Sequence, residues 1–293
     1  MNKGFGVRKS PKKILDYCGA FRAKGMEFPA SFTLEEERIP DVRDQGSVNS
    51  CVAFSATNIM QVLNQLETGR RDRFSPGYMY GKCRDENDTY QGMIIDNALD
   101  YLIKTGSCFE EDFPENLEVP EIMEKARNRP DLDKKAEPYH IRAYEVYASA
   151  SEERRTNDIK RALYQFKTPL LASTDYFGVL HAVCVIGWDD KTERYTILNS
   201  WGKEWGDNGR GTVPYNKIER GYLLVDEKNS DIIMPFTDVP ENEWYYKAVQ
   251  HVYNAGLMNG TSETMFEPEK TMTRAEMAQV LVNLCKKIDE LKS

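Results

Sequence analysis

A thiol, an imidazole and two carboxamides occur along this chain in an order that suits acyl transfer by a cysteine. The thiol, Cys51, directly follows a polar turn and begins a segment whose apolar residues recur at helical spacing. At a helix start, the unpaired amides and the helix dipole lower the pKa of a thiol, and the thiolate is the reactive form. A free cysteine is also commonly a small buried apolar residue, so Cys51 alone leaves both interpretations open.

His181 and Asn199 supply what a reactive thiol needs, because each belongs to one strand of an expected hairpin. If the two side chains lie close together, the Asn side chain can orient the imidazole. The imidazole then withdraws the thiol proton and later protonates the leaving amine. Gln45 precedes Cys51 by six residues. Its amide could donate to a developing oxyanion beside the backbone N–H of Cys51.

The elements that position these side chains are predicted from periodicity and turn residues. Residues 51–69 predict a long helix that Gly69 ends, and 181–188 with 195–201 predict the hairpin. Helices before the hairpin and strands around it are typical of an α+β fold. Further helices are expected at 92–105, at 120–129 before Pro130 and at 157–167, and further strands at 169–174 and 211–215.

Three motifs, 45-QGSVNSCVAFS-55, 181-HAV-183 and 199-NSWGKEWGDNG-209, resemble those of the papain-like cysteine peptidases. The order Cys, His, Asn and the separations of 130 and 148 residues agree with that family. The resemblance covers about residues 28–230. It implies a two-lobed fold, with a helical left lobe and a β-barrel-like right lobe, and a thiol endopeptidase that needs no cofactor or metal.

The resemblance also implies a role for each matching residue. Cys51 and His181 would face each other across the cleft as the reacting pair. Asn199 would orient the imidazole, and Gln45 would donate a hydrogen bond to the oxyanion. Trp201 would shield the Asn–His bond, and the Gln91-Gly92 pair would bond the substrate backbone. The interpretation of Gln91-Gly92 as a plain helix-entry turn stays open.

The sequence departs from the family pattern at several points. Val48 stands where a disulfide cysteine is usual, and Val52 replaces the usual Trp after the nucleophile. Only residues 175–180 separate strand 169–174 from His181, which should open one cleft wall and alter substrate preference. Residues 1–27 precede the mature-like start. With seven basic and two acidic residues, they are either a solvated tail or a short, removable inhibitory strap.

Beyond the peptidase-like region, residues 236–284 resemble one S-layer homology (SLH) repeat, with F-x-D-V, F-x-P and T-R-A-E motifs. The expected module, 235–287, is a small all-α helical hairpin with helices at 243–256 and 273–287. Thr273 and Glu276 form an expected capping box. The resemblance implies binding to secondary cell-wall polysaccharide of Gram-positive-type bacteria, with Arg274 as a ligand-binding residue.

An apolar stripe on the second helix of this module is expected to be core. Such modules commonly act in threes, so a single copy suggests self-association or a role other than tight wall anchoring. The stripe consists of Met277, Val280, Leu281 and Leu284.

Composition bounds the possible partners. The net charge of −8 and pI near 5.2 argue against a nucleic-acid binder, because phosphate contacts need a basic face. No apolar run approaches the roughly 20 residues that span a bilayer, so no membrane partner is expected. The six cysteines are scattered and form no expected disulfide framework or metal site.

Two other functions remain open from the sequence. A papain-like lobe can serve as a non-catalytic binding or scaffold surface, and the nucleophile can serve transpeptidation or the processing of one dedicated substrate. Localisation is a conflict: no secretory signal is visible, which indicates the cytoplasm, whereas the SLH module indicates the cell wall.

Overall fold

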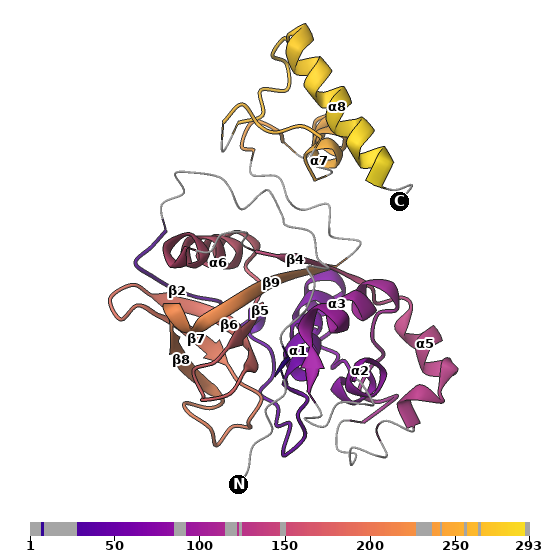
Figure 1. Cartoon of the computed structure of the whole chain (residues 1–293), viewed down its shortest axis with the longest axis vertical. Coiled ribbons are helices and arrows are strands. Elements are labelled where there is room, and N and C mark those ends of the chain that lie inside the picture. The colour runs from indigo at the N-terminus through magenta and orange to yellow at the C-terminus, as the bar shows by residue number, and fades with distance from the viewer. Residues whose placement is uncertain are drawn as a thin grey trace. The chain divides into compact units, whose positions relative to one another are not determined.

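The structure, a computed structural model, describes residues 7–8, 28–84, 92–114, 122, 125–146, 151–226, 236–240, 242–254, 257–262 and 265–290. The chain divides into two compact units, one that includes residues 28–226 and one that includes residues 236–290. Figure 1 shows both units. Across the described residues, no helix is long and apolar enough to cross a membrane.

The first unit gathers its helices beside a sheet (Figure 1). Helix α1, Cys51–Thr68, begins at the predicted residue, is buried from Cys51 to Asn64 and ends at Gly69, whose φ of 74° is left-handed. Three further helices are α2 (Pro76–Cys83), α3 (Ile95–Lys104) and α5 (Pro130–Ala136).

Residues 122 and 125–127, within the helix predicted at 120–129, are helical, and the helical residues end before Pro130 as expected. Pro130 also begins a helix that was not predicted, α5. Proline lies at the first helical position there, where its missing N–H has no intrahelical partner to lose.

The sheet has the strand order β4-β9-β5-β6-β7-β8, with β2 also paired to β6. All pairings are antiparallel. Strands β5 and β6 are buried almost throughout because α1 and α6 (Glu152–Phe166) both pack against them. The strand bounds are β2 Ser31–Thr33, β4 Ile141–Glu145, β5 Leu170–Thr174, β6 His181–Asp189, β7 Arg194–Leu198, β8 Arg210–Pro214 and β9 Ile218–Asp226.

Two short strands form a separate parallel pair. Strand β1, Val7–Arg8, aligns with β3, Met93–Ile94, in the register Val7 with Met93. The segment 92–105, predicted to be all helix, therefore begins as a strand, and α3 starts only at Ile95.

Helix α1 and strand β6 meet through buried polar groups as well as apolar ones. The Cys184 thiol on β6 donates to the Ser55 carbonyl of α1 at 3.4 Å. Five cysteines lie within the described part of the chain, and all five are free thiols. Packing and hydrogen bonds, without cross-links between these cysteines, therefore hold α1 against the sheet.

The second unit is a small helical hairpin of α7, Tyr246–Asn254, and α8, Arg274–Glu290. Its core is formed by Phe236, Val239, Val249 and Phe266. Asp238, the acid of the F-x-D-V motif, accepts backbone N–H groups of Phe266 and Glu267 at 2.9 and 2.7 Å. The motif thus ties the entry segment to the loop between the helices.

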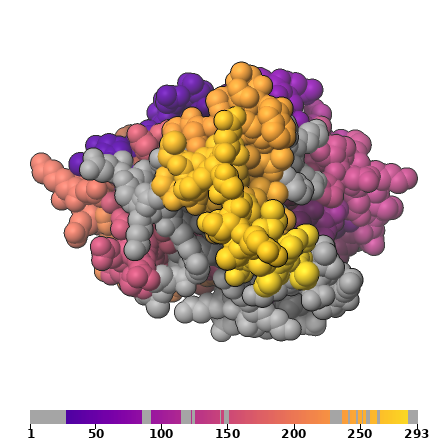
Figure 2. Space-filling view, turned by 90° about the horizontal axis from the view of Figure 1, so that it is seen from above, coloured from indigo at the N-terminus to yellow at the C-terminus, as the bar shows by residue number. Residues whose placement is uncertain are grey.

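Helix α8 has the predicted capping box. The Glu276 N–H donates to the Thr273 hydroxyl at 3.2 Å, and the Thr273 N–H donates to the Glu276 carboxylate at 2.7 Å. The prediction that its apolar stripe is core is wrong for three of its four residues, and the fourth, Val280, is half-buried. Met277, Leu281 and Leu284 are 49%, 53% and 39% exposed, and Figure 2 shows α8, in yellow, along the surface. A hairpin of two helices has too little partner surface to cover both faces of α8.

Candidate active site

The thiol of Cys51 lies at the first position of α1, behind a tight turn. The Asp44 carboxylate accepts from the Gly46 N–H at 2.9 Å, and Gly46 adopts a φ of 60° that favours glycine. Ser50, the residue before the helix, makes no side-chain cap, so the helix start is not closed by its hydroxyl. Cys51 is fully buried.

The imidazole of His181 is fixed by the predicted hairpin. His181 begins β6, and β7 pairs with β6 in the register Cys184 with Leu198, which places Asn199 beside His181. The Asn199 Oδ1 atom lies 2.8 Å from His181 Nε2. Asn199 Oδ1 also accepts the Ser200 N–H at 2.8 Å.

These two bonds fix the protonation pattern of the neutral imidazole. If the Asn199 amide were flipped, its NH2 group would face the N–H of Ser200, and two donors would meet. The amide oxygen must therefore face both the Ser200 N–H and His181 Nε2. His181 Nε2 then carries the proton that it donates, and Nδ1 is left as the acceptor nitrogen. Such a ring can take a proton from a thiol at Nδ1 without losing its bond to Asn199.

Aromatic rings cover the His181–Asn199 pair. The Trp201 ring lies 4.7 Å from the imidazole, centroid to centroid, at an interplanar angle of 31°. Phe177 contacts both rings edge-on at 5.7 and 5.1 Å, and Trp205 contacts Trp201 at 5.6 Å. Burial in this enclosure lowers the pKa of His181 to about 4, although the bond to Asn199 acts in the opposite direction.

Gln45 is linked to the strand end that carries Asn199. Its Oε1 accepts from the Ser200 hydroxyl at 2.5 Å, and its backbone N–H donates to the Ser200 carbonyl at 2.9 Å. Its Nε2, which carries two hydrogens, donates one to the Val48 carbonyl at 2.7 Å. The Gln45 amide is therefore held in one orientation within the loop that leads to Cys51.

The glycine-rich loop after Asn199 brings the chain back onto this strand end. The Asn199 N–H donates to the Gly209 carbonyl at 2.9 Å. Gly209 has a φ of 80°, and a Cβ atom there would lie 2.4 Å from a Val42 methyl group. A larger residue would strain the backbone and collide with Val42, so the motif needs glycine at this position.

The structure thus brings Gln45, Asn199, His181 and Trp201 together around the start of β6 and the end of β7. Cys51 begins the helix that packs against β6. Gly92 is buried next to β3, whereas Gln91 lies outside the described residues. Reasoning from the sequence missed Ser200 and the rings of Phe177 and Trp205. Ser200 and Trp205 lie inside the N-S-W-G-x-x-W-G run, which was the available signal; Phe177 had none.

Two more histidines and the predicted ligand-binding residue Arg274 complete the set of candidate side chains. His140 Nδ1 lies 2.9 Å from the Ile103 carbonyl, which is consistent with packing, and the His251 side chain lies outside the described residues. Arg274 is an exposed residue at the start of α8. Within the described part of the chain, no three His, Cys, Asp or Glu side chains are placed to hold a metal ion.

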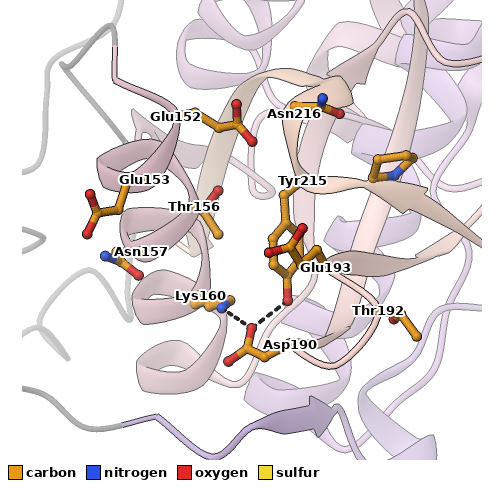
Figure 3. A pocket seen from close by; sticks show the side chains of 11 residues that line it. Glu152, Glu153, Thr156, Asn157, Lys160, Asp190, Thr192, Glu193, Tyr215 and Asn216 are labelled. Carbon is orange, nitrogen blue, oxygen red and sulfur yellow. Dashed lines mark hydrogen bonds and ion pairs between the residues drawn. The ribbon is translucent and has the colours of Figure 1, made fainter.

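A cavity of about 610 Å³ lies elsewhere on the sheet, between α6, the turn after β6 and residues 214–216 (Figure 3). Asp190 accepts from the Tyr215 hydroxyl at 2.7 Å and pairs with Lys160. His181 begins β6 whereas Asp190 follows its end, a distance of about 30 Å along the strand at roughly 3.3 Å per residue. The cavity is thus separate from the candidate active site.

Comparisons with known proteins identify the two regions of the chain. The papain family cysteine protease profile matches residues 28–222, and the S-layer homology domain profile matches residues 235–278. A cysteine protease of Blomia tropicalis is 25% identical over 231 residues, covering 67% of this chain and 62% of that protein. The probable cysteine protease RD21B of Arabidopsis thaliana is 27% identical over 223 residues, covering 69% and 46%.

Solved structures share the fold. Xylellain, a cysteine protease from Xylella fastidiosa, superposes with a TM-score of 0.61 at 19% identity, covering 76% of this chain and 96% of that one. Digestive procathepsin L 3 of Tenebrio molitor larval midgut gives 0.56 at 19% identity, covering 76% of each chain.

The predicted α+β, papain-like fold is confirmed by these structures, and the predicted SLH module by its profile. The chain spans about half to three fifths of the length of the curated relatives that it matches. Because the papain profile covers more than half of this sequence, the chain belongs to the papain family cysteine proteases.

Proposed function

We propose that this protein is an endopeptidase that cleaves peptide bonds with Cys51 as nucleophile and His181 as base and acid. The observation that carries the proposal is the bond between His181 Nε2 and Asn199 Oδ1. It leaves Nδ1 as the proton acceptor on a strand that packs against the helix of Cys51. Family membership supports the same chemistry.

In this mechanism His181 Nδ1 takes the Cys51 proton, and the sulfur attacks the carbonyl carbon of the substrate. The carbonyl oxygen becomes an oxyanion, which the Cys51 N–H and the Gln45 amide stabilise. When the tetrahedral intermediate collapses, the C–N bond breaks and the amine leaves with the proton from Nδ1. Water then attacks the thioester, losing its proton to Nδ1, and the released thiol regains that proton.

We also propose that the basic segment 1–27 is an inhibitory strap. Only Val7 and Arg8 of this segment are described, and they pair with Met93–Ile94, directly beside Gly92. Gly92 belongs to the segment proposed to pair with substrate, so both would use the same backbone edge. Full burial of Cys51 and His181 agrees with a covered site. Deleting residues 1–27 should raise the cleavage rate of a small peptide, and an unchanged rate would contradict the strap.

For the SLH module we propose self-association through the exposed stripe of α8, together with binding of acidic cell-wall polysaccharide through Arg274. Exposed apolar patches of this kind commonly mark interaction surfaces. Leu281→Lys should convert an associated species to monomer in sedimentation velocity, whereas Gln279→Lys, on the same helix outside the stripe, should not. Arg274→Ala should weaken co-sedimentation with purified cell walls without changing the monomer content.

The proposed activity is tested by incubating wild type and Cys51→Ala protein with a denatured protein substrate, followed by mass analysis of the products. Cys285→Ala is the matched control because it removes an exposed thiol from the second unit. Wild type and Cys285→Ala should release the same peptides, and Cys51→Ala should release none. Equal cleavage by Cys51→Ala would refute the proposal, and an added amine acceptor appearing in the products would indicate transpeptidation.

A further inference from the structure

A cluster of charged side chains joins α3 to the sheet of the first unit. The Arg220 Nε donates to Glu145 at 3.0 Å, and its Nη1 donates to Asp96 at 3.2 Å. The Tyr222 hydroxyl donates to the other Asp96 oxygen at 2.8 Å. The mechanism proposed above uses none of these residues.

Strand register places Arg220 in the row beside the one that contains His181. Ser173 on β5 pairs with Ala182 on β6 and with Arg220 on β9, and the neighbouring Thr174 pairs with His181. Residues paired across strands share a face, so Arg220 and Ala182 lie on one face of the sheet, about 9.5 Å apart at two strand spacings. Cys184, two residues beyond Ala182, contacts α1 from this face.

Through Asp96, Arg220 is bonded to the helix that follows the segment proposed to pair with substrate. Asp96, its partner, is the second residue of α3, and α3 directly follows Gly92 and β3. Arg220 therefore links its own row, which includes Ala182, to the start of α3 just after the Gly92–Ile94 edge. A peptide lying along this edge with its carbonyl at Cys51 would pass the guanidinium.

Arg220 is the member of the cluster that faces outward. Its side chain is 27% exposed, whereas those of Asp96 and Glu145 are 0% and 10% exposed. Among the described residues its hydrogen bonds come from Nε and Nη1, and none comes from Nη2. The Nη2 edge thus keeps N–H donors for a visiting group.

Charge decides which group suits this edge. Two carboxylates face one guanidinium, so a further full negative charge gains less here than at an isolated arginine. A cationic side chain meets the guanidinium first and is repelled, and an aliphatic one leaves the donors without an acceptor. A carboxamide oxygen accepts the N–H groups and adds no charge.

We propose that Arg220 is a specificity-determining residue that selects substrate side chains ending in a carboxamide oxygen, with carboxylates second and aliphatic or basic side chains disfavoured. This inference rests on the proposed peptidase function. The expected preference for Gln over Leu or Arg at one substrate position is roughly tenfold, the effect of one hydrogen bond to a charged group.

The test is a positional-scanning library of fluorogenic peptides, cleaved by the full-length protein. Arg220→Met removes the donors and keeps the length of the side chain. Arg194→Met is the matched control, because Arg194 lies on β7 and bonds Thr212 away from this row. Arg220→Lys keeps a cation with fewer donors and should keep a reduced preference.

The wild type and Arg194→Met should favour Gln at the same position, and Arg220→Met should lose that preference while it still cleaves other library members. A wild-type profile without Gln or Glu preference at any position overturns the inference, even if Arg220→Met does not fold. An unchanged preference in Arg220→Met does so too and leaves Arg220 a purely structural link. Absence of any cleavage both by the wild type and by the protein without residues 1–27 would instead refute the proposed function.

Discussion

The low pKa of His181 gives a prediction that can be tested apart from catalysis. In wild type, a Cys51 thiolate would raise the pKa of the neighbouring imidazole, because an opposite charge favours the charged form. Cys51→Ser removes that charge and keeps the packing nearly unchanged. In this variant the imidazole should titrate with a pKa of about 4, because burial lowers it and the Asn199 bond only partly opposes this effect.

The same shift predicts how stability depends on pH. The unfolded chain binds the His181 proton near pH 6.5, whereas the folded Cys51→Ser protein binds it only near pH 4. Stability from this group is therefore complete above about pH 6.5 and is lost as the pH falls towards 4. A difference of about 2.5 units corresponds to about 3 kcal/mol of unfolding free energy.

Two measurements check this reasoning. The chain has only three histidines, so the NMR titration of labelled imidazoles is simple, and Cys51→Ser/His181→Gln identifies the His181 signal by its absence. Urea unfolding at pH 7 and pH 4 should show that Cys51→Ser loses about 3 kcal/mol more than the double variant. An imidazole that titrates at 6.5 or above, or equal losses in both variants, would refute the role of burial.

Three further outcomes are expected. Gln45→Ala should lower kcat by about 10²- to 10³-fold, because it removes an oxyanion donor. Ser200→Ala removes only the hydroxyl bond that orients Gln45 and should lower kcat less. Equal effects of the two substitutions would contradict a direct role of the Gln45 amide. Phe177→Ala, made in Cys51→Ser, should raise the pKa of His181 towards 6.5 by admitting water, as the same NMR titration would show. Thr273→Ala should destabilise the second unit by about 1 kcal/mol through loss of the helix cap, measured by its thermal unfolding against Thr271→Ala; an unchanged midpoint would contradict the cap.

Local patterns in the sequence predict the elements near the site well. The start of α1 at Cys51, its end at Gly69 and the hairpin of β6 and β7 follow from helical spacing, a glycine stop and turn residues. The hairpin alone places Asn199 beside His181, because both residues lie near paired strand ends. These features depend on contacts between residues close in the chain, which periodicity can report.

Features that depend on distant residues could not be predicted. Strand β9 received no assignment, because its apolar run alone does not distinguish a buried strand from a helix. Arg220 and Asp96 are 124 residues apart and meet only through the packing of α3 on the sheet. The exposed stripe of α8 has helical spacing, which predicts that the stripe is covered by another surface. The spacing does not say whether that surface belongs to the same chain.

The free thiols of the first unit have a consequence for handling the enzyme. A reactive cysteine is oxidised easily and must be kept reduced, and in a fold closed by disulfides the same reductant would attack the scaffold. Cys108 and Cys184 are buried thiols within the described part of the chain, and burial raises the pKa of each to about 12. Reductant can therefore restore the Cys51 thiol while leaving the packing around these two residues intact.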